Sequence, residues 1–355
     1  MGLPAEALLS GPRGRRLCWI ALDEQSFERT GRYQLRALEY GGTERILPIL
    51  RSVLAEADLA EYASSDDVVD LLELVANSVD SARYWQEPDE IDAALTDPEL
   101  IDLLAPVAEA IARAPASTWW SSGLALGDQV LVERREDGAP PPRLKGAPAV
   151  LAAWKARALD DEVRLRGRDV SGVWWSSPTG ALGSEAAKRF GDDPPALNRT
   201  TRSLPSLGAV GLLLEEDSFG TPSARCWPLR ASRAPRVFEV RGEDDWRALT
   251  ERYPIEVTFG RRGNWDLATG RSGRWVLADW SLVAEDYDAV HLSALAYLAT
   301  SGRALSLSSG AATLIAGWNA DETYWLADVP EVSGAPSEWV AAEHHPARRW
   351  QRRGR

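Results

Sequence analysis

The segment around His291 carries residue types that acid–base chemistry needs. His291 is the only histidine of the chain before residue 344, and it lies near the end of a stretch that reads as a strand. An imidazole can accept and release a proton near neutral pH. Ser293 falls on the same strand face as His291, because side chains alternate along a strand. We therefore predict a catalytic or ligand-positioning role for His291, with a hydrogen-bonded structural histidine as the alternative.

Glu322 follows downstream, between two strand-like segments. The order His291, Tyr297, Glu322 resembles that found in ADP-ribosyltransferase-like modules, and a second order of such modules, Arg–Ser–Glu, falls on Arg236, Ser293 and Glu322. The resemblance covers at most the last hundred residues. It implies that an aromatic and a hydrogen-bonding residue hold the nicotinamide of NAD, while the glutamate stabilises an oxocarbenium-like transition state. On this basis we predict His291, Tyr297 and Glu322 as catalytic residues.

Arginines and tryptophans are interleaved over residues 259–280. They are Arg261, Arg262, Arg271 and Arg274 with Trp265, Trp275 and Trp280. Guanidinium groups beside aromatic rings suit phosphate groups, nucleotides or single-stranded nucleic acid through charge and stacking. The intervening glycines favour a mobile loop over a site, and the alternative is an ordinary surface loop. We predict that Arg271, Arg274 and Trp275, together with Ser293, bind an anionic ligand.

Three adjacent carboxylates, Glu215, Glu216 and Asp217, follow an apolar strand-like segment. Carboxylate oxygens are ligands that Mg²⁺ and Ca²⁺ accept. A solvated turn is the more common reason for such a run, so we expect no metal site.

The acidity of the chain is concentrated in one segment. Of the net charge of −13, residues 53–109 hold 16 carboxylates against one base, Arg83. Acidic helix faces usually serve only solvation, but an excess of this size is also typical of a surface that binds a basic protein. Because phosphate contacts need clustered cations, double-stranded nucleic acid is not an expected partner.

Hydrophobic periodicity predicts the elements that must position these residues. Residues 43–116 show helical spacing, and later segments alternate between strand and helix patterns bounded by glycine and proline. The fold class we expect is α+β, with an acidic all-helical N-terminal module followed by mixed sheet-and-helix middle and C-terminal parts. The predicted regions are an N-terminal segment (1–42), the acidic helical module (43–116), a mixed β-rich middle region (117–235), an α+β C-terminal module (236–329) and an irregular basic tail (330–355).

Composition indicates in which cellular compartment the protein is expected and which classes of protein are excluded. No apolar run approaches the roughly 20 residues that cross a bilayer, and the first residues lack a signal-peptide pattern. The two cysteines, Cys18 and Cys226, have no metal-binding spacing, and only three lysines stand among 40 basic residues, as in proteins from GC-rich bacterial genomes. We therefore expect a soluble, cytoplasmic bacterial protein with no membrane partner.

Two function classes remain open at this point. The leading hypothesis is an enzyme that acts on a nucleotide-like or other anionic small molecule through residues 236–329. The alternative is a non-catalytic interaction or regulatory protein that binds a basic partner through its acidic helical module. Phosphate-binding loops, dinucleotide-binding glycine motifs, nucleophile elbows and HExxH zinc motifs are all absent, which disfavours the enzymes that depend on them.

Overall fold

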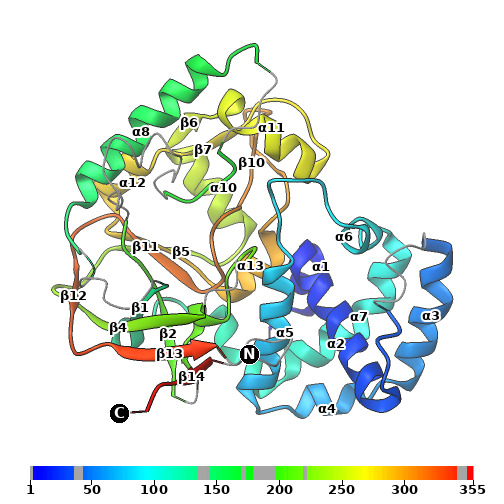
Figure 1. The fold of residues 1–355 in the computed structure, drawn as a ribbon. Helices are drawn as coiled ribbons and strands as arrows, with labels where there is room; N and C mark the ends of the chain where they lie inside the picture. Colours follow the sequence, from blue (N-terminus) through cyan, green and yellow to red (C-terminus); the bar gives the residue numbers. More distant parts are fainter. Residues whose placement is uncertain are drawn as a thin grey trace.

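The computed structural model describes residues 3–35, 43–134, 142, 144–168, 173–178, 197–205, 207–218, 222–341 and 350–354. The fold class is α+β, as predicted: helices form the N-terminal part, and a mixed sheet with further helices follows (Figure 1). No described helix is both long and apolar enough to cross a membrane.

The N-terminal part is a packed group of helices. They are α1 (Ala5–Ser10), α2 (Pro12–Thr30), α3 (Thr43–Glu56), α4 (Leu59–Ser64), α5 (Val68–Asp80), α6 (Glu90–Ala94) and α7 (Pro98–Arg113). Four of the acidic side chains, Asp58, Asp67, Asp89 and Asp97, accept hydrogen bonds from the first-turn N–H groups of the helices they precede. Part of the acidity of this segment therefore stabilises helix ends.

Helix α2 lies at the centre of this group and contacts α1, α5, α7 and, from the C-terminal part, α13 (Ala294–Thr300). The sequence predicted only an N-terminal segment over residues 1–42 and did not indicate this helix. The physical reason is that α2 is buried on several sides, since every residue from Leu17 to Asp23 is buried. A helix covered all round shows no one-sided apolar stripe in its sequence.

One large mixed sheet forms the centre of the rest of the molecule, in the order β14-β13-β4-β1-β2-β11-β8-β5. Among the described strands of this sheet, only β5 and β8 pair in parallel, and the other pairs are antiparallel. The strands are β1 (Gln129–Glu133), β2 (Arg199–Leu204), β4 (Ser223–Ala231), β5 (Val237–Val240), β8 (Ala289–Leu292), β11 (Glu322–Trp325), β13 (Ser337–Ala341) and β14 (Trp350–Arg352), with β3 (Gly208–Ala209) on β2 and β12 (Pro330–Val332) on β4.

Further helices, short strands and turns pack around this sheet and against one another. They are α8 (Ala147–Arg164), α10 (Glu243–Arg252), α11 (Thr258–Thr269), α12 (Trp280–Asp286) and α13, with the strand pairs β6 (Pro254–Glu256)–β7 (Val276–Ala278) and β9 (Leu305–Ser306)–β10 (Ala312–Thr313) and the 3₁₀ turns η2 (Pro115–Ser121), η3 (Leu126–Asp128) and η4 (Val210–Leu212). Trp246, Trp280 and Trp318 pack against one another with ring centroids 5.6–6.0 Å apart. Tryptophan burial is thus a main source of the core between these elements.

Three local expectations differ from the structure. The segment 259–269, expected as part of a loop, belongs to helix α11, which ends at Gly270 in a left-handed conformation (φ 67°). The described residues 173–178 contain no strand, although they belong to the predicted β-rich middle region. The described parts of 330–355 form β12, β13 and β14 on the large sheet rather than an irregular tail, because these strands pair with β4 and with each other.

Candidate functional site

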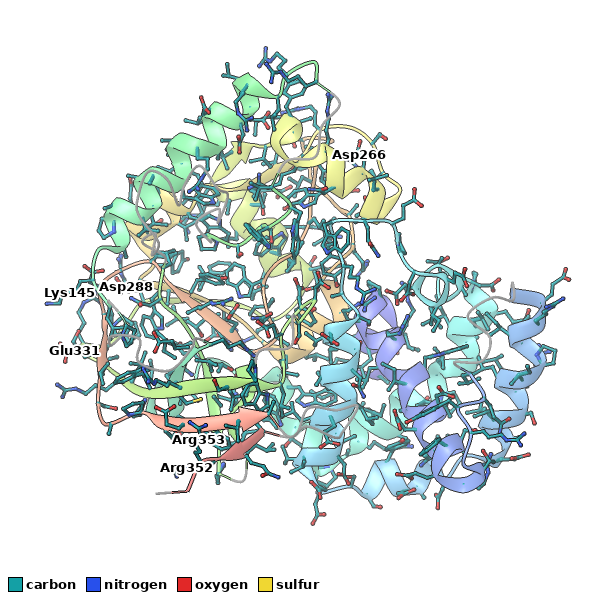
Figure 2. The ribbon with its side chains drawn as sticks, in the orientation of Figure 1. Lys145, Asp266, Asp288, Glu331, Arg352 and Arg353 are labelled. Atoms are coloured by element: carbon teal, nitrogen blue, oxygen red, sulfur yellow. The ribbon has the colours of Figure 1, made fainter. Side chains whose placement is uncertain are left out.

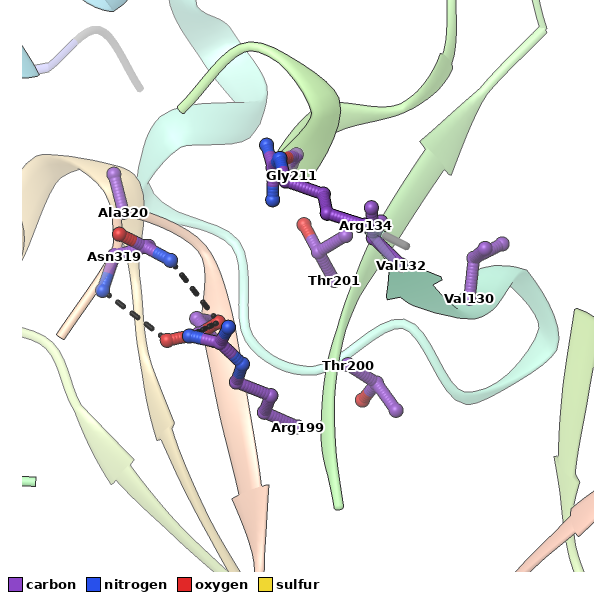
Figure 3. A pocket seen from close by; sticks show the side chains of 10 residues that line it. Val130, Val132, Arg134, Arg199, Thr200, Thr201, Gly211, Asn319 and Ala320 are labelled. Atoms are coloured by element: carbon purple, nitrogen blue, oxygen red, sulfur yellow. Dashed lines mark hydrogen bonds and ion pairs between the residues drawn. The ribbon is translucent and has the colours of Figure 1, made fainter. Parts of the chain in front are cut away.

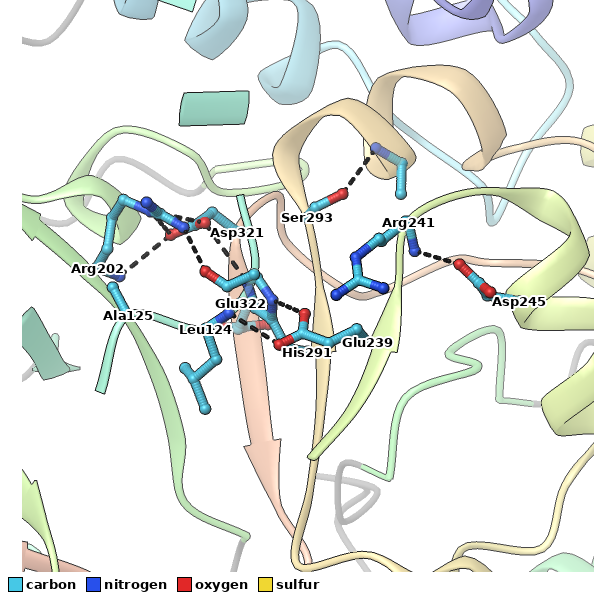
Figure 4. A network of polar contacts seen from close by, with 12 residues as sticks. Leu124, Ala125, Arg202, Glu239, Arg241, Asp245, His291, Ser293, Asp321 and Glu322 are labelled. Atoms are coloured by element: carbon cyan, nitrogen blue, oxygen red, sulfur yellow. Dashed lines mark hydrogen bonds and ion pairs between the residues drawn. The ribbon is translucent and has the colours of Figure 1, made fainter. Parts of the chain in front are cut away.

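His291 lies on β8 in a closed set of polar contacts, which we call the His291 network: Glu239, His291, Asp321 and Arg202 (Figure 4). His291 Nδ1 lies 2.7 Å from Glu239 Oε2, and Nε2 lies 3.4 Å from Asp321 Oδ1. Asp321 also accepts from the backbone N–H and the Nε of Arg202. The imidazole is 1% exposed, so both of its nitrogens face protein carboxylates rather than solvent.

The charges of this network are matched. Burial alone would lower the pKa of His291, but contacts with Asp321 and Glu239 outweigh it, so the pKa is raised. Burial would raise the pKa of Glu239, yet its hydrogen bond to His291 and the Leu124 N–H leave it lowered. A raised pKa for His291 and a lowered pKa for Glu239 are the shifts expected of an ion pair. Together with Asp321, this pair holds β5 and β8 to the segment before β11.

Ser293 and Arg236 also have partners of their own. The Ser293 side chain accepts from the Ala296 N–H and caps α13, and Arg236 contacts Asp288. Both contacts are structural ones: a helix cap and an ion pair near the start of β8.

Tyr297 belongs to a second buried group, the Glu216 cluster, which consists of Arg13, Tyr84, Glu216 and Tyr297. Tyr297 is completely buried on α13 and interacts with Glu216 and with Tyr84. Burial raises the pKa of both tyrosines. Arg13 is also buried and contacts Asp92, the Ser78 carbonyl oxygen and the Ser81 hydroxyl.

Glu322 begins β11 and lines a narrow hollow between β1, β2 and the segment before β11 (Figure 3). Its carboxylate accepts from the backbone N–H and the side-chain amide of Asn319, each at 3.2 Å, and lies 3.7 Å from Arg199. The hollow has a volume of about 10 Å³, which is about what one water molecule needs. It cannot hold a substrate as the structure stands.

The structure therefore places the three predicted catalytic residues in three different settings. His291, Tyr297 and Glu322 are 1%, 0% and 7% exposed, and each contacts different partners. Tyr297 and Glu322 are linked only indirectly, since the Glu216 backbone N–H donates to Asn319 Oδ1 and Asn319 donates to Glu322. A molecule the size of NAD could not touch all three without uncovering them, so the arrangement lends no support to a nicotinamide site there.

The predicted arginine contacts lie on the surface around a buried tryptophan. Arg271 stacks over Trp275 at 4.9 Å and donates to the carbonyl oxygens of Arg274 and Gly310. Arg274 pairs with Glu256, and Trp275 is wholly buried and donates to Asp266. These three residues hold the turn between α11 and β7.

The neighbouring Arg261 is inside the fold rather than over a site. It is buried within α11 and donates to the Trp175 carbonyl oxygen. Burial lowers the pKa of Arg261 to about 10.

The three adjacent carboxylates that were considered as metal ligands contact different partners. Glu215 pairs with Arg134, Glu216 Oε2 accepts from the Gly317 N–H, and Asp217 accepts from Trp85 Nε1. Among the described residues, no group of three His, Cys, Asp or Glu side chains is placed to hold a metal ion.

A large cleft lies elsewhere, and none of the predicted site residues lines it. It has a volume of about 740 Å³ and lies between the first turn of α2, residues 81–96 and the C-terminal end of α11. Figure 2 labels Asp266, which lines the cleft from α11. Its charged and polar lining is Arg13, Arg15, Ser81, Arg83, Tyr84, Gln86, Glu87, Asp89, Asp92, Thr96, Asp266, Thr269 and Arg303. The volume is in the range of small-molecule binding sites.

Arg15 is the exceptional cation of this cleft. Its side chain has no ion pair or hydrogen bond with any described residue, and its Nε is buried. Burial and the positive charges of Arg303 and Arg13 lower the pKa of Arg15, against the opposing charge of Asp92. The other arginines of the lining contact carboxylates, Arg13 with Asp92 and Arg303 with Glu243.

A glycine in the wall of the cleft allows the backbone to pass close to the Tyr84 ring. Gly302 has a φ of 80°, and a Cβ atom there would come within 2.3 Å of the Tyr84 ring. Both the conformation and the close approach require glycine at this position.

Sequence reasoning missed this cleft because its lining comes from segments far apart in the chain. One sequence feature could have indicated the cleft: the run Arg13-Gly14-Arg15-Arg16 at the start of a helix. In an arginine-rich chain, however, such a run is expected from composition and does not by itself indicate a site.

No protein-family model matches the chain. Comparisons with curated proteins and with solved structures also find no match. The ADP-ribosyltransferase-like order of His291, Tyr297 and Glu322 therefore stays a prediction based on those residues alone.

Proposed function

We propose that the protein binds a small anionic molecule in the cleft between α2, residues 81–96 and the end of α11. The observation that carries this proposal is Arg15, a partly buried arginine that forms no ion pair with any described residue and lies near two further arginines in a cavity of about 740 Å³. Like charges held together in a partly buried site are unfavourable, and a bound anion removes that cost.

Two features support an anion rather than a cation at this end of the cleft. Asp89 and Asp92 are already paired with Arg16 and Arg13, so their charges are largely matched. Helix α2 begins at Pro12 without a side-chain cap, and Pro12 itself lines the cleft. The positive end of the helix dipole therefore adds to the field of the arginines.

The hypothesis of an enzyme is compatible with this site, but none of the predicted catalytic residues lines the cleft. The anionic ligand of the leading hypothesis is retained in the proposal, at a different place from the one the sequence indicated. Catalysis by His291, Tyr297 and Glu322 and a basic partner for the acidic helices stay predictions.

The proposal is tested by calorimetric titration of the protein with sulfate, and then with phosphate esters, carboxylates and nucleotides including NAD. We expect Arg15→Gln to weaken sulfate binding about tenfold, since charge-assisted hydrogen bonds are worth roughly 1.5–3 kcal/mol. Arg113→Gln is the matched control, because Arg113 is an exposed arginine on α7 that does not line the cleft. Equal affinities of wild type and Arg15→Gln, or no binding at all, would refute the proposal.

A further inference from the structure

Three buried polar groups lie behind the cleft without hydrogen bonds of ordinary geometry. They are the hydroxyls of Tyr84 and Tyr297 and the Oε1 atom of Glu216. Tyr84 lines the cleft and interacts with Tyr297, which in turn interacts with Glu216. These contacts fall outside ordinary hydrogen-bond geometry, so the three groups are weakly paired with one another rather than unpaired.

The groups that face Glu216 come from several elements. Tyr297 of α13, Arg13 of α2 and the Gly317 N–H, which donates to Oε2 at 2.6 Å, favour the ionised carboxylate, while Glu322 of β11 opposes it. Burial is the largest effect and raises the pKa of Glu216 to about 8. At neutral pH the carboxyl group is therefore mostly protonated, which suits a site with no full counter-charge.

We propose that, at the mildly alkaline pH where Glu216 is partly ionised, its carboxyl group takes up a proton from solvent when an anion enters the cleft, so that anion and proton bind together. This inference rests on the proposed function. Arg13 connects the two sites, because it lines the cleft and also interacts with Glu216. An anion near Arg13 and Arg15 disfavours the Glu216 carboxylate, and by thermodynamic reciprocity a proton on Glu216 raises the affinity for the anion by the same factor.

The test uses sulfate as the probe, because its charge does not change between pH 6.5 and 9.5. We expect the sulfate affinity of the wild type to fall on the order of fivefold from pH 6.5 to 9.5. At pH 8 binding takes up a fraction of a proton, which appears as a heat that depends on the ionisation enthalpy of the buffer.

Glu216→Gln is the decisive variant, since an amide mimics the protonated carboxyl group and its oxygen can still accept from the Gly317 N–H. It is expected to bind sulfate equally at both pH values and to take up no proton at pH 8. Glu215→Gln is the matched control, because Glu215 is the adjacent residue and pairs with Arg134 instead. This control keeps the wild-type pH dependence.

Tyr297→Phe supplies a second measure that leaves the carboxyl group in place. The Tyr297 hydroxyl favours ionised Glu216, so its removal shifts the midpoint of the affinity change to higher pH. A wild-type affinity that is equal at both pH values, or a change that persists in Glu216→Gln, overturns the inference while the anion site stands. Absence of sulfate binding at both pH values overturns the proposed function, and the coupling with it.

Discussion

The His291 network and the Glu216 cluster are both buried, and they differ in how completely their polar atoms are paired. Both nitrogens of His291 face carboxylates, and Asp321 is held in addition by two N–H groups of Arg202. In the Glu216 cluster two tyrosine hydroxyls and one carboxylate oxygen interact with one another outside ordinary hydrogen-bond geometry. The first arrangement is what a folded core needs, and the second leaves weakly paired polar groups beside a cavity.

This difference shows that a residue that stands out in the sequence need not be free to bind a ligand in the structure. His291 stands out in the sequence because it is nearly unique, but its contacts leave it no free nitrogen to offer a ligand. Arg15 and Glu216 do not stand out among 40 basic and 53 acidic residues. Yet Arg15 lines the cleft without an ion pair in the described part of the chain, and Glu216 lies close behind the cleft. Residue type alone therefore favours the His291 network as the functional site, whereas the geometry favours the cleft and the Glu216 cluster.

The largest effect is expected from breaking the complete network. Asp321→Ala leaves Arg202 and His291 without their shared carboxylate, and loss of one partner of a buried ion pair typically costs about 3–5 kcal/mol. We expect the free energy of unfolding in urea to fall by about that amount. Asp244→Ala is the control, because Asp244 is almost fully exposed and should change stability by less than about 0.5 kcal/mol. A loss below about 1 kcal/mol for Asp321→Ala would contradict a structural role for the His291 network.

A pH-dependent effect of intermediate size is expected in the Glu216 cluster. Glu216 has a pKa of about 8 in the folded protein, above the ordinary value of 4.5, so the folded state binds a proton that the unfolded state lacks between these values. The stability contributed by Glu216 is therefore full below pH 4.5 and is lost as the pH rises through 8. Relative to Glu216→Gln, the wild type should lose about 3 kcal/mol of unfolding free energy between pH 5 and 8.

Urea denaturation of both proteins across this range checks that prediction. Glu215→Gln serves again as the control and should run parallel to the wild type. A constant difference between wild type and Glu216→Gln would show that Glu216 is ionised in the folded protein, and the contrast between the two networks would then lose its electrostatic basis.

Local patterns predicted much of the secondary structure. The fold class follows from helical spacing in 43–116 and from the alternation of strands and helices after residue 236. That alternation appears as β5, α10, β6, α12, β8 and α13, with α11 and β7 between β6 and α12 where a loop was expected. Asp97 and Asp279 cap α7 and α12 through contacts with nearby N–H groups, which a sequence displays directly. Such features depend on neighbours within a few residues.

The features that sequence reasoning could not reach depend on distant contacts. Helix α2 is covered on several sides, so it lacks the one-sided pattern by which a helix is recognised. Residues 337–341 are a strand because they pair with β4, more than a hundred residues earlier in the chain. The cleft joins Arg15 to Arg303 and Asp266, and neither spacing nor composition signals that such residues meet.

The smallest effect is expected from removing a weakly paired hydroxyl, and it tests the comparison most finely. Tyr84→Phe deletes an oxygen that has no hydrogen bond of ordinary geometry, so stability should change by less than about 0.5 kcal/mol. Tyr62→Phe is the matched variant in the same group of helices, because the Tyr62 hydroxyl donates to the Ala21 carbonyl oxygen at 2.7 Å. Loss of that bond should cost about 1 kcal/mol. If urea denaturation instead gives the larger loss for Tyr84→Phe, the Tyr84 hydroxyl is well bonded in solution, and the Glu216 cluster is as complete as the His291 network.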